Sequence, residues 1–271
     1  MHLDAGGEPE YLLEIDGLAK TFKGLHAVED YRLRLRAREI LGIIGPNGAG
    51  KSTVFNLLTG HIRPSGGTIR FRGRNLKGLS ADRIARLGIG RTFQNIRLFS
   101  SMTVLENVIT ARQLRQRGRF LATVFSWPTF RRGEERLARE AREVLRLFSL
   151  EQRAAEMAGS LAYGDQRRLE IVRALALEPA LLLLDEPTAG MSSQESLFVL
   201  DLIRRIRDQY RLTIIIVEHN MPLVMRLCER IQVLNYGQII AEGTPAQVRA
   251  DPRVVESYLG QVEEDAEAPV G

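Results

Sequence analysis

The sequence predicts an α/β fold, in which a covered parallel sheet carries an antiparallel β subdomain and an inserted helical subdomain. Three short, continuously apolar runs, "EILGIIG", "ALLLLDE" and "RLTIIIVEHN", are the expected central strands. Such runs are typical of parallel strands, because helices cover both of their faces. Residues 31–36 and 68–73 instead alternate apolar with charged or polar side chains. A period of two predicts half-exposed antiparallel strands.

The segment at about residues 100–162 carries few strand signals and is the predicted helical insertion. Within it, "EERLAREAREVLRLF" places apolar side chains along one helical stripe, namely Leu137, Ala141, Val144, Leu145 and Phe148. We therefore expect a single domain over residues 10–260, interrupted by this insertion. Residues 261–271 are acidic and poor in apolar side chains, so we expect a disordered tail.

Composition favours a soluble globular chain, with 271 residues of which 44% are hydrophobic and 26% charged. The apolar runs at residues 181–184 and 214–217 are far shorter than the roughly 18 residues that cross a bilayer. The first ten residues show neither the basic start nor the apolar stretch of a secretory signal. Cys228 is the single cysteine, so an internal disulfide is excluded and a reducing cytosol is expected.

The net charge of +5 comes largely from arginines, many of them between residues 112 and 142. Such a run attracts nucleic acid, acidic lipid or a partner protein. The run lacks the interleaved aromatic residues on which bases stack. We therefore favour a solvated basic helix face and expect no nucleic-acid partner.

A glycine-rich loop, "GPNGAGKST" at Gly45–Thr53, follows the apolar strand "ILGII" and opens a helical stretch. It fits the pattern G-x-x-x-x-G-K-[ST] in its required strand-to-helix context. Its glycines permit backbone angles that turn N–H groups toward phosphate oxygens. Lys51 supplies a charge for the β- and γ-phosphates, and Ser52 a hydroxyl ligand for Mg²⁺. The expected nucleotide contacts are Gly45, Asn47, Gly48, Gly50, Lys51, Ser52 and Thr53.

An acidic pair, Asp185 and Glu186, ends the apolar strand "LLLLDEP". Adjacent strand residues point to opposite sides, so the two carboxylates are free to do different work. Asp185 is expected to hold the water shell of Mg²⁺, and Glu186 to polarise the attacking water. An acidic pair is also common where a strand meets solvent, but the phosphate loop favours the catalytic interpretation.

Three further motifs narrow the class of nucleotide enzyme. Gln94 lies in "RTFQNIRLF", a helix begins at "LAYGDQ" upstream of the acidic strand, and His219 ends the next apolar strand. With the phosphate loop and acidic strand, these motifs resemble the ATP-binding-cassette (ABC) family, in its order and over most of the chain. The resemblance implies a P-loop ATPase that works as a head-to-tail pair. Each ATP then lies between the phosphate loop of one subunit and the signature loop, here "LAYGDQ", of the other.

This arrangement gives a reason for placing Gly164 at the start of a helix. Unpaired amides and the helix dipole make a helix N-terminus a site for an anion. In the pair implied by the resemblance, that anion is the γ-phosphate of the partner's ATP.

The resemblance also assigns roles to individual residues. Phe22, in "KTFKG", stacks on adenine, although a lone Phe is also common at the end of a core strand. Tyr163 and Gly164 contact the partner's nucleotide. The implied catalytic residues are Glu186, His219 and Gln94, and the implied Mg²⁺ residues are Ser52, Gln94 and Asp185.

The chain departs from the usual signature Leu-Ser-Gly-Gly-Gln. It has Ala162 for the serine, Tyr163 for the first glycine and Asp165 for the glutamine, and Ser192 replaces the usual aspartate after the acidic strand. Asp165 adds negative charge near a phosphate, so the amides around Gly164 must carry the contact. We expect a weaker or asymmetric ATP sandwich, which a heterodimer would tolerate.

Nearly the full length resembles the ATP-binding subunit of branched-chain amino-acid importers, including "RTFQNIRLFSSMTVLENV", "YGDQRRLEIVRAL" and "IIAEGTPAQVRADPRVVESYLG". The resemblance implies a protein at the cytoplasmic face of the inner (plasma) membrane. Its partners are a second ABC ATPase, identical or different, two membrane permeases and, indirectly, a solute-binding protein. Members of this class also carry urea, short amides or aromatic acids, so the cargo stays open. Residues 100–142 are the expected permease-docking segment, with Trp127 either an anchor there or buried within the helices.

Two alternatives are less favoured. A soluble ABC-type ATPase acting on nucleic acid or ribosomes usually has two cassettes or long coiled coils, whereas this chain has one cassette and no sustained heptads. A scaffold with an inactive site would not need Lys51, Asp185, Glu186 and His219, which are all present.

Overall fold

The computed structural model describes residues 10–116 and 127–257, together with their side chains except those of residues 114–116 and 127–134. The acidic tail proposed for residues 261–271 lies outside the described residues. The described chain divides into two compact units. Of the described residues, the first unit contains 10–84 and 212–257, and the second contains 85–116 and 127–211.

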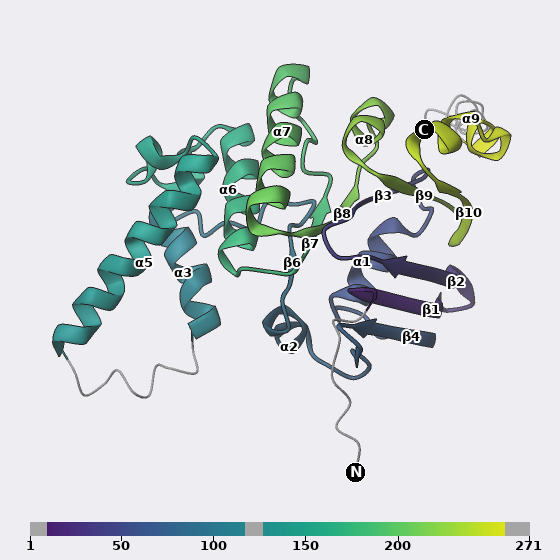
Figure 1. The fold of residues 1–271 in the computed structure, drawn as a ribbon, viewed down its shortest axis with the longest axis horizontal. Coiled ribbons are helices and arrows are strands. Elements are labelled where there is room, and N and C mark those ends of the chain that lie inside the picture. Colours follow the sequence, from purple (N-terminus) through teal and green to yellow (C-terminus); the bar gives the residue numbers. More distant parts are fainter. Residues whose placement is uncertain (1–9, 117–126, 258–271) are drawn as a thin grey trace, which may run out of the picture. The chain divides into compact units, whose positions relative to one another are not determined.

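An antiparallel sheet forms one part of the first unit. β1 (Leu13–Phe22) pairs with β2 (Leu25–Leu35) on one side and β4 (Gly66–Phe71) on the other, and β5 (Arg74–Asn75) pairs with β4 (Figure 1). Along β2, Tyr31 and Leu33 are buried whereas Arg32 is exposed. The antiparallel strands predicted at residues 31–36 and 68–73 are therefore confirmed.

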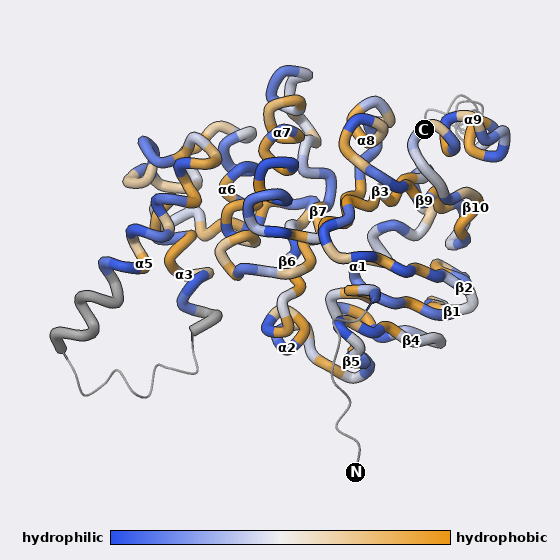
Figure 2. The backbone as a smooth tube through the Cα atoms, viewed as in Figure 1, coloured by the Kyte–Doolittle hydropathy of each residue, from blue (hydrophilic) through white to orange (hydrophobic). Residues whose placement is uncertain are grey.

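Parallel strands form the other part of the first unit. β3 (Ile40–Ile44) pairs in parallel with both β8 (Thr213–Val217) and β9 (Arg230–Asn235), and β10 (Gln238–Gly243) pairs antiparallel with β9. Every residue of β3 and β8 is buried, which their apolar character explains (Figure 2). The helices of this unit are α1 (Lys51–Leu58), α8 (Met221–Leu227) and α9 (Pro245–Ala250), and α2 (Ala81–Arg86) leads into the second unit.

The second unit holds two parallel strands and the four longest helices of the described residues. β6 (Ile89–Arg91) pairs with β7 (Leu181–Asp185). The α-helices are α3 (Val104–Gln116), α5 (Trp127–Leu147), α6 (Tyr163–Ala176) and α7 (Ser193–Tyr210), and the 3-10 turns are η2 (Glu151–Arg153) and η3 (Ala158–Ser160).

The segment predicted to be helical contains, in its described part, helices, turns and one isolated β-bridge between Thr103 and Met157. The predicted apolar stripe is buried, namely Leu137, Ala141, Val144, Leu145 and Phe148. The domain boundaries at residues 10–260, with an insertion at about 100–162, stay a prediction. Within the described ranges, no helix combines the length and apolar character that a bilayer requires.

A buried hydrogen bond links the two sheets of the first unit. The Tyr31 hydroxyl donates to Gln232 Oε1 at 2.6 Å, and both side chains are fully buried. Burial raises the pKa of Tyr31 above its ordinary value, so the hydroxyl stays a donor. The Gln232 amide nitrogen in turn donates to the backbone oxygen of Arg32 at 3.1 Å and to Glu242 at 2.9 Å. These bonds hold β2, and with it the β1–β2 hairpin, against β9.

Replacing Tyr31 with Phe removes the donor and leaves Gln232 Oε1 buried. We expect the free energy of unfolding of the purified chain to fall by about 1–3 kcal/mol, measured by urea titration. Tyr236→Phe is the matched control, because Tyr236 is 77% exposed in the β9–β10 turn. The control should change the free energy by less than about 0.5 kcal/mol. Equal stability of the two variants would contradict a role for the Tyr31 hydroxyl.

Candidate functional site

The loop between β3 and α1 adopts a backbone that only glycine accommodates. Gly45 has φ of 150° and Gly50 has φ of 102°, in the region that L side chains rarely adopt. A Cβ at Gly45 would lie 2.1 Å from the backbone oxygen of Leu234, and one at Gly50 would lie 2.5 Å from that of Ala27. Backbone from β9 and β2 therefore closes around the loop and fixes its path.

Lys51 begins α1 and is 6% exposed. Its ammonium group donates to the backbone oxygens of Gly45 and Pro46, at 2.7 Å each. These bonds hold the positive charge against the loop itself. Asn47, Gly48 and Ser52 are exposed. The loop thus combines a cation, the N-terminus of a helix and an accessible hydroxyl, which together suit a phosphate chain.

His219 extends from the same sheet edge as the phosphate loop. It lies two residues beyond Val217, the last residue of β8, and is exposed. β3 and β8 are parallel neighbours with Ile43 opposite Val217, so both segments leave the carboxyl ends of adjacent strands. Ligands of open α/β sheets bind at such an edge.

Phe22 ends β1 at the tip of the β1–β2 hairpin and is 44% exposed. The Lys20 ammonium lies 4.8 Å from the centre of its ring, a cation–π distance. This exposure suits the stacking role that the resemblance implies, and it does not fit the alternative of a buried strand end.

In the second unit, Asp185 is the last residue of β7 and is 3% exposed. Its carboxylate accepts a hydrogen bond from Arg91 at 3.0 Å, and its backbone N–H donates to Thr92 Oγ1 at 3.0 Å. Burial lowers the pKa of Arg91, while the bond to Asp185 opposes that shift. Arg91 therefore offsets the buried negative charge and orients the carboxylate. Sequence reasoning missed Arg91, because its partner lies 94 positions away.

Glu186 turns away from the strand with φ of 48°, a conformation that is uncommon for a residue with a side chain. The side-chain amide of Gln94 donates to the two oxygens of the Glu186 carboxylate, at 3.4 and 3.3 Å. The structure thus brings together two of the three residues predicted to be catalytic. Strained backbone of this kind is frequent at functional sites.

The signature loop enters α6 at Tyr163, and Ala162 caps the helix without a side-chain hydrogen bond. Gly164 is the second helical residue, and a Cβ there would lie 3.1 Å from Glu195 Oε1. Tyr163 is 45% exposed. Its ring covers Gly190, where a Cβ would lie 2.9 Å from Tyr163 Cε1. Glycine at position 190, where φ is 74°, therefore makes room for the Tyr163 ring, and a side chain at position 164 would crowd the Glu195 carboxylate.

The structure accounts for two of the departures from the usual signature. Asp165 is 5% exposed, and its carboxylate pairs with Arg153 at 2.9 Å and with Arg168. Two cations therefore neutralise the charge that we expected near the phosphate.

Ser192 has a structural role of its own as the N-cap of α7. Its hydroxyl accepts from the backbone N–H of Glu195 at 3.3 Å, and the Glu195 carboxylate accepts from that of Ser192 at 2.9 Å. The spacing Ser-x-x-Glu is the usual signal of this capping box. Sequence reasoning could have found it, but treated Ser192 only as a missing aspartate.

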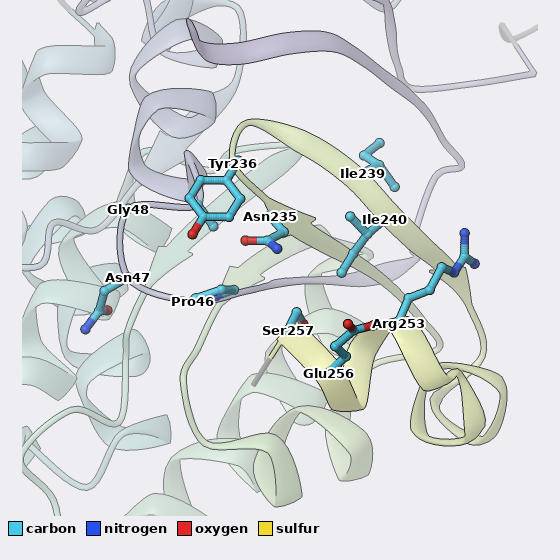
Figure 3. A pocket seen from close by; sticks show the side chains of 11 residues that line it. Pro46, Asn47, Gly48, Asn235, Tyr236, Ile239, Ile240, Arg253, Glu256 and Ser257 are labelled. Atoms are coloured by element: carbon cyan, nitrogen blue, oxygen red, sulfur yellow. The ribbon is translucent and has the colours of Figure 1, made fainter. Parts of the chain in front are cut away.

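A cavity of about 730 Å³ lies beside the phosphate loop (Figure 3). Its walls come from the loop, the β9–β10 hairpin and the helical residues 252–257. Tyr236 lines the cavity at the end where the loop residue Gly48 lies (Figure 3). The sequence carried no signal for this cavity.

The glycine loop with its buried lysine, and the acidic strand end with its glutamine, define an ATPase of the P-loop class with an ABC-type signature helix. A family model described as ABC transporter matches residues 28–189, and a second, branched-chain amino acid ATP-binding cassette transporter, matches residues 238–264. The chain belongs to the ABC transporter family. The resemblance seen in the sequence is confirmed, and so is the predicted fold class.

Curated relatives match along almost all of the chain. The high-affinity branched-chain amino acid transport ATP-binding protein LivG of Salmonella typhimurium is 45% identical, with 92% of this chain and 98% of the relative covered. BraF of Pseudomonas aeruginosa, which carries the same description, is 44% identical with the same coverage. The lipopolysaccharide export system ATP-binding protein LptB of Escherichia coli is 34% identical, covering 92% of this chain and 97% of the relative.

Solved structures show the same fold. The ADP conformation of MJ1267, an ATP-binding cassette of an ABC transporter, has a TM-score of 0.79 at 28% identity, with 92% of this chain and 98% of that chain covered. A dimeric post-hydrolysis state of MJ0796 bound to ADP and Pi has a TM-score of 0.74 at 26% identity, covering 86% and 98%. With the family membership, these matches identify the chain as an ATP-hydrolysing transporter subunit.

Crowding at Gly164 generates a prediction. In Gly164→Ala the new methyl group would lie 3.1 Å from Glu195 Oε1. Because the Ser192–Glu195 capping box restrains that carboxylate, we expect part of the adjustment to fall on the turn. We expect ATP hydrolysis by the assembled transporter to fall by about tenfold, because amides at an anion site act only when they are aimed at it. Steady-state phosphate release measures the effect.

Shortening the opposing side chain supplies the control. Glu195→Asp in the Gly164→Ala background should relieve the crowding and recover most of the rate. Full activity of Gly164→Ala alone, or no recovery in the double variant, would show that this contact does not set the position of the turn.

Proposed function

We propose that this chain hydrolyses ATP as one of two paired ATPase subunits and powers the uptake of branched-chain amino acids through a membrane importer. One observation carries the choice of cargo. Relatives described as branched-chain amino acid transport ATP-binding proteins are 44–45% identical over 250 residues, and the second family model covers residues 238–264 at the C-terminal end.

In this proposal the first unit grips the nucleotide. Phe22 stacks on adenine, and His219 contacts the γ-phosphate. The buried Lys51 moves its ammonium group from the loop oxygens to the β- and γ-phosphates. The remaining phosphate contacts are Gly45, Asn47, Gly48, Gly50, Ser52 and Thr53.

Mg²⁺ would be held by the Ser52 hydroxyl and, through water, by Asp185, with Gln94 also near it. The exposed hydroxyl of Ser52 and the oriented carboxylate of Asp185 are the hard oxygen donors that this ion prefers. When bound, the ion neutralises charge that develops on the phosphate oxygens.

Glu186 is the proposed general base, and Gln94 orients it. Two hydrogen bonds from the Gln94 amide nitrogen hold the carboxylate in position. From there the carboxylate polarises the water that attacks the γ-phosphate. Removal of this phosphate weakens the contact with the partner's helix N-terminus, so hydrolysis loosens the pair.

The proposed assembly contains a second ABC ATPase, identical or different, whose Tyr163–Gly164 counterpart covers the nucleotide of this chain. Two permeases dock on the helical region, and a solute-binding protein delivers the cargo from outside. The assembly places this chain peripherally at the cytoplasmic face of the inner membrane. The side chain of Trp127, the suggested docking anchor, lies outside the described residues.

Several arginines of the basic segment pair with glutamates, and for this reason the proposal includes no nucleic-acid partner. Arg112 bonds Glu140 and Glu178, at 3.0 Å each, and Arg136 bonds Glu140 at 2.8 Å. Arg146 bonds Glu151 at 2.7 Å. Acidic neighbours thus offset several of the arginines that a phosphate backbone would need.

Reconstitution in vesicles tests the cargo. With its permeases and binding protein, the chain should drive ATP-dependent accumulation of labelled leucine, which excess isoleucine or valine reduces and excess urea or acetamide does not. Branched-chain amino acids would make similar contacts in the cargo pocket of the binding protein, whereas urea and acetamide lack the charged groups of an amino acid. Accumulation of urea or amides in place of leucine would overturn the cargo while leaving the ATPase proposal intact.

Replacing Glu186, the proposed general base, tests the mechanism of ATP hydrolysis. Glu186→Gln should lower phosphate release at least about hundredfold, while ATP remains bound and the ATPase pair persists in light scattering. Glu178→Gln serves as the control, because Glu178 is an exposed carboxylate on the surface of the second unit. Near-normal hydrolysis by Glu186→Gln would assign the base elsewhere.

A further inference from the structure

Arg167 connects three parts of the second unit through one buried guanidinium. The side chain is 5% exposed. Its Nε donates to the Tyr163 hydroxyl at 3.0 Å. One terminal nitrogen donates to the backbone oxygen of Phe93 at 2.8 Å, and the other donates to that of Gln94. A single planar group therefore contacts both the signature turn and the loop that bears Gln94.

Glu170 also bonds the loop that bears Gln94, and together with Arg167 it forms a clamp on the backbone of Phe93. Its carboxylate accepts from Arg167 at 3.3 Å and from the backbone N–H of Phe93 at 3.2 Å. Phe93 is thus held at its N–H by Glu170 and at its oxygen by Arg167. Burial raises the pKa of Glu170, and the bonds to Phe93 and Arg167 oppose that shift.

The clamp determines where the side chain of Gln94 can reach. With its backbone oxygen bonded to Arg167, Gln94 places its amide 3.3 and 3.4 Å from the Glu186 oxygens. Charge-assisted bonds from a guanidinium fork are directional. A displacement of the Tyr163 hydroxyl therefore shifts the guanidinium and, with it, the Gln94 backbone, and the reverse also holds.

Tyr163 is the exposed end of this connection. Its ring rests on Gly190 and its hydroxyl bonds Arg167, whereas the usual signature has glycine at this position. A glycine has no atom that reaches Arg167. The tyrosine thus gives this chain a bond that the usual signature lacks.

We propose that Arg167 is a positioning residue that couples the signature turn to Gln94 and, through it, to the proposed base Glu186 of the same chain. The inference rests on the proposed function, in which the partner's nucleotide lies on the Tyr163–Gly164 turn. Nucleotide on the turn fixes the Tyr163 hydroxyl and keeps the guanidinium aligned. Occupation of one ATP site thereby orients the glutamine and the base that serve the other site.

Two conservative variants of the full chain, assayed in the assembled transporter, test the coupling. Tyr163→Phe keeps the ring on Gly190 but removes the hydroxyl, and Arg167→Lys keeps the charge but loses the fork. Each should lower kcat for phosphate release by about three- to tenfold, the net worth of one ordinary hydrogen bond. KM for ATP should stay within about twofold, because Lys51 still holds the phosphates.

The double variant shows whether Tyr163 and Arg167 affect kcat through the same hydrogen bond or independently of each other. If Tyr163 acts through Arg167, then Tyr163→Phe with Arg167→Lys should be no slower than Arg167→Lys alone. Tyr210→Phe, which removes a hydroxyl at the end of α7, should keep wild-type kcat. The thermal midpoint of Tyr163→Phe should fall by a few degrees at most and stay well above the assay temperature, so the lower kcat is measured on folded protein.

Three results would overturn the coupling: wild-type kcat in Tyr163→Phe, a multiplied loss in the double variant, or a rise in KM with unchanged kcat. The last result would mean that the hydroxyl binds ATP directly. Failure of the proposed function would look different, because the wild type would then release no phosphate or Glu186→Gln would remain active.

Discussion

In the proposed function, the strongest constraint on this molecule is that backbone amides must face a phosphate chain at the end of a buried strand. Side chains cannot supply this surface, because Cβ atoms at Gly45 and Gly50 would collide with the backbone of β9 and β2. The loop therefore depends on the strands around it as much as on its own glycines. The Tyr31–Gln232 bond holds β2 against β9, so a contact in the core maintains the shape of the phosphate loop.

In the second unit, several buried charged groups lie beside partners of opposite charge. Asp185 pairs with Arg91, Asp165 with two arginines, and Arg167 with Glu170. Burying an isolated charge costs several kcal/mol, and only close, well-oriented partners repay it. Because each pair also bonds backbone or a site side chain, neutralisation and positioning are achieved by the same contacts.

The sequence predicted the strands, the helical stripe and the phosphate loop, because each depends on residues that are close together in the chain. The buried strands β3, β7 and β8, the alternating strands β2 and β4, and the helical stripe ending at Phe148 follow from periodicity alone. The phosphate loop follows from glycine spacing. The capping box at Ser192–Glu195 was also readable, but was overlooked. The clamps of Arg91 and Arg167 were not predictable, because 94 and 73 positions separate these arginines from Asp185 and the Gln94 backbone. The roles expected of Lys51, Ser52, Asp185 and Glu186 follow from the phosphate-loop pattern and the acidic strand end. Those of Phe22, Gln94, Tyr163, Gly164 and His219 rest on family resemblance.

The unusual signature is best understood as a set of substitutions that depend on one another. Tyr163 fits only because Gly190 leaves room beneath its ring, and its hydroxyl has a use only because Arg167 lies one helical turn away. Asp165 is compatible with the proposed phosphate-binding turn because Arg153 and Arg168 pair with its carboxylate. Restoring the usual glutamine at that position would leave two arginines facing each other without the charge between them. The turn therefore has to be judged as a unit, and a comparison of single positions with the usual motif underestimates its capacity to hold an anion.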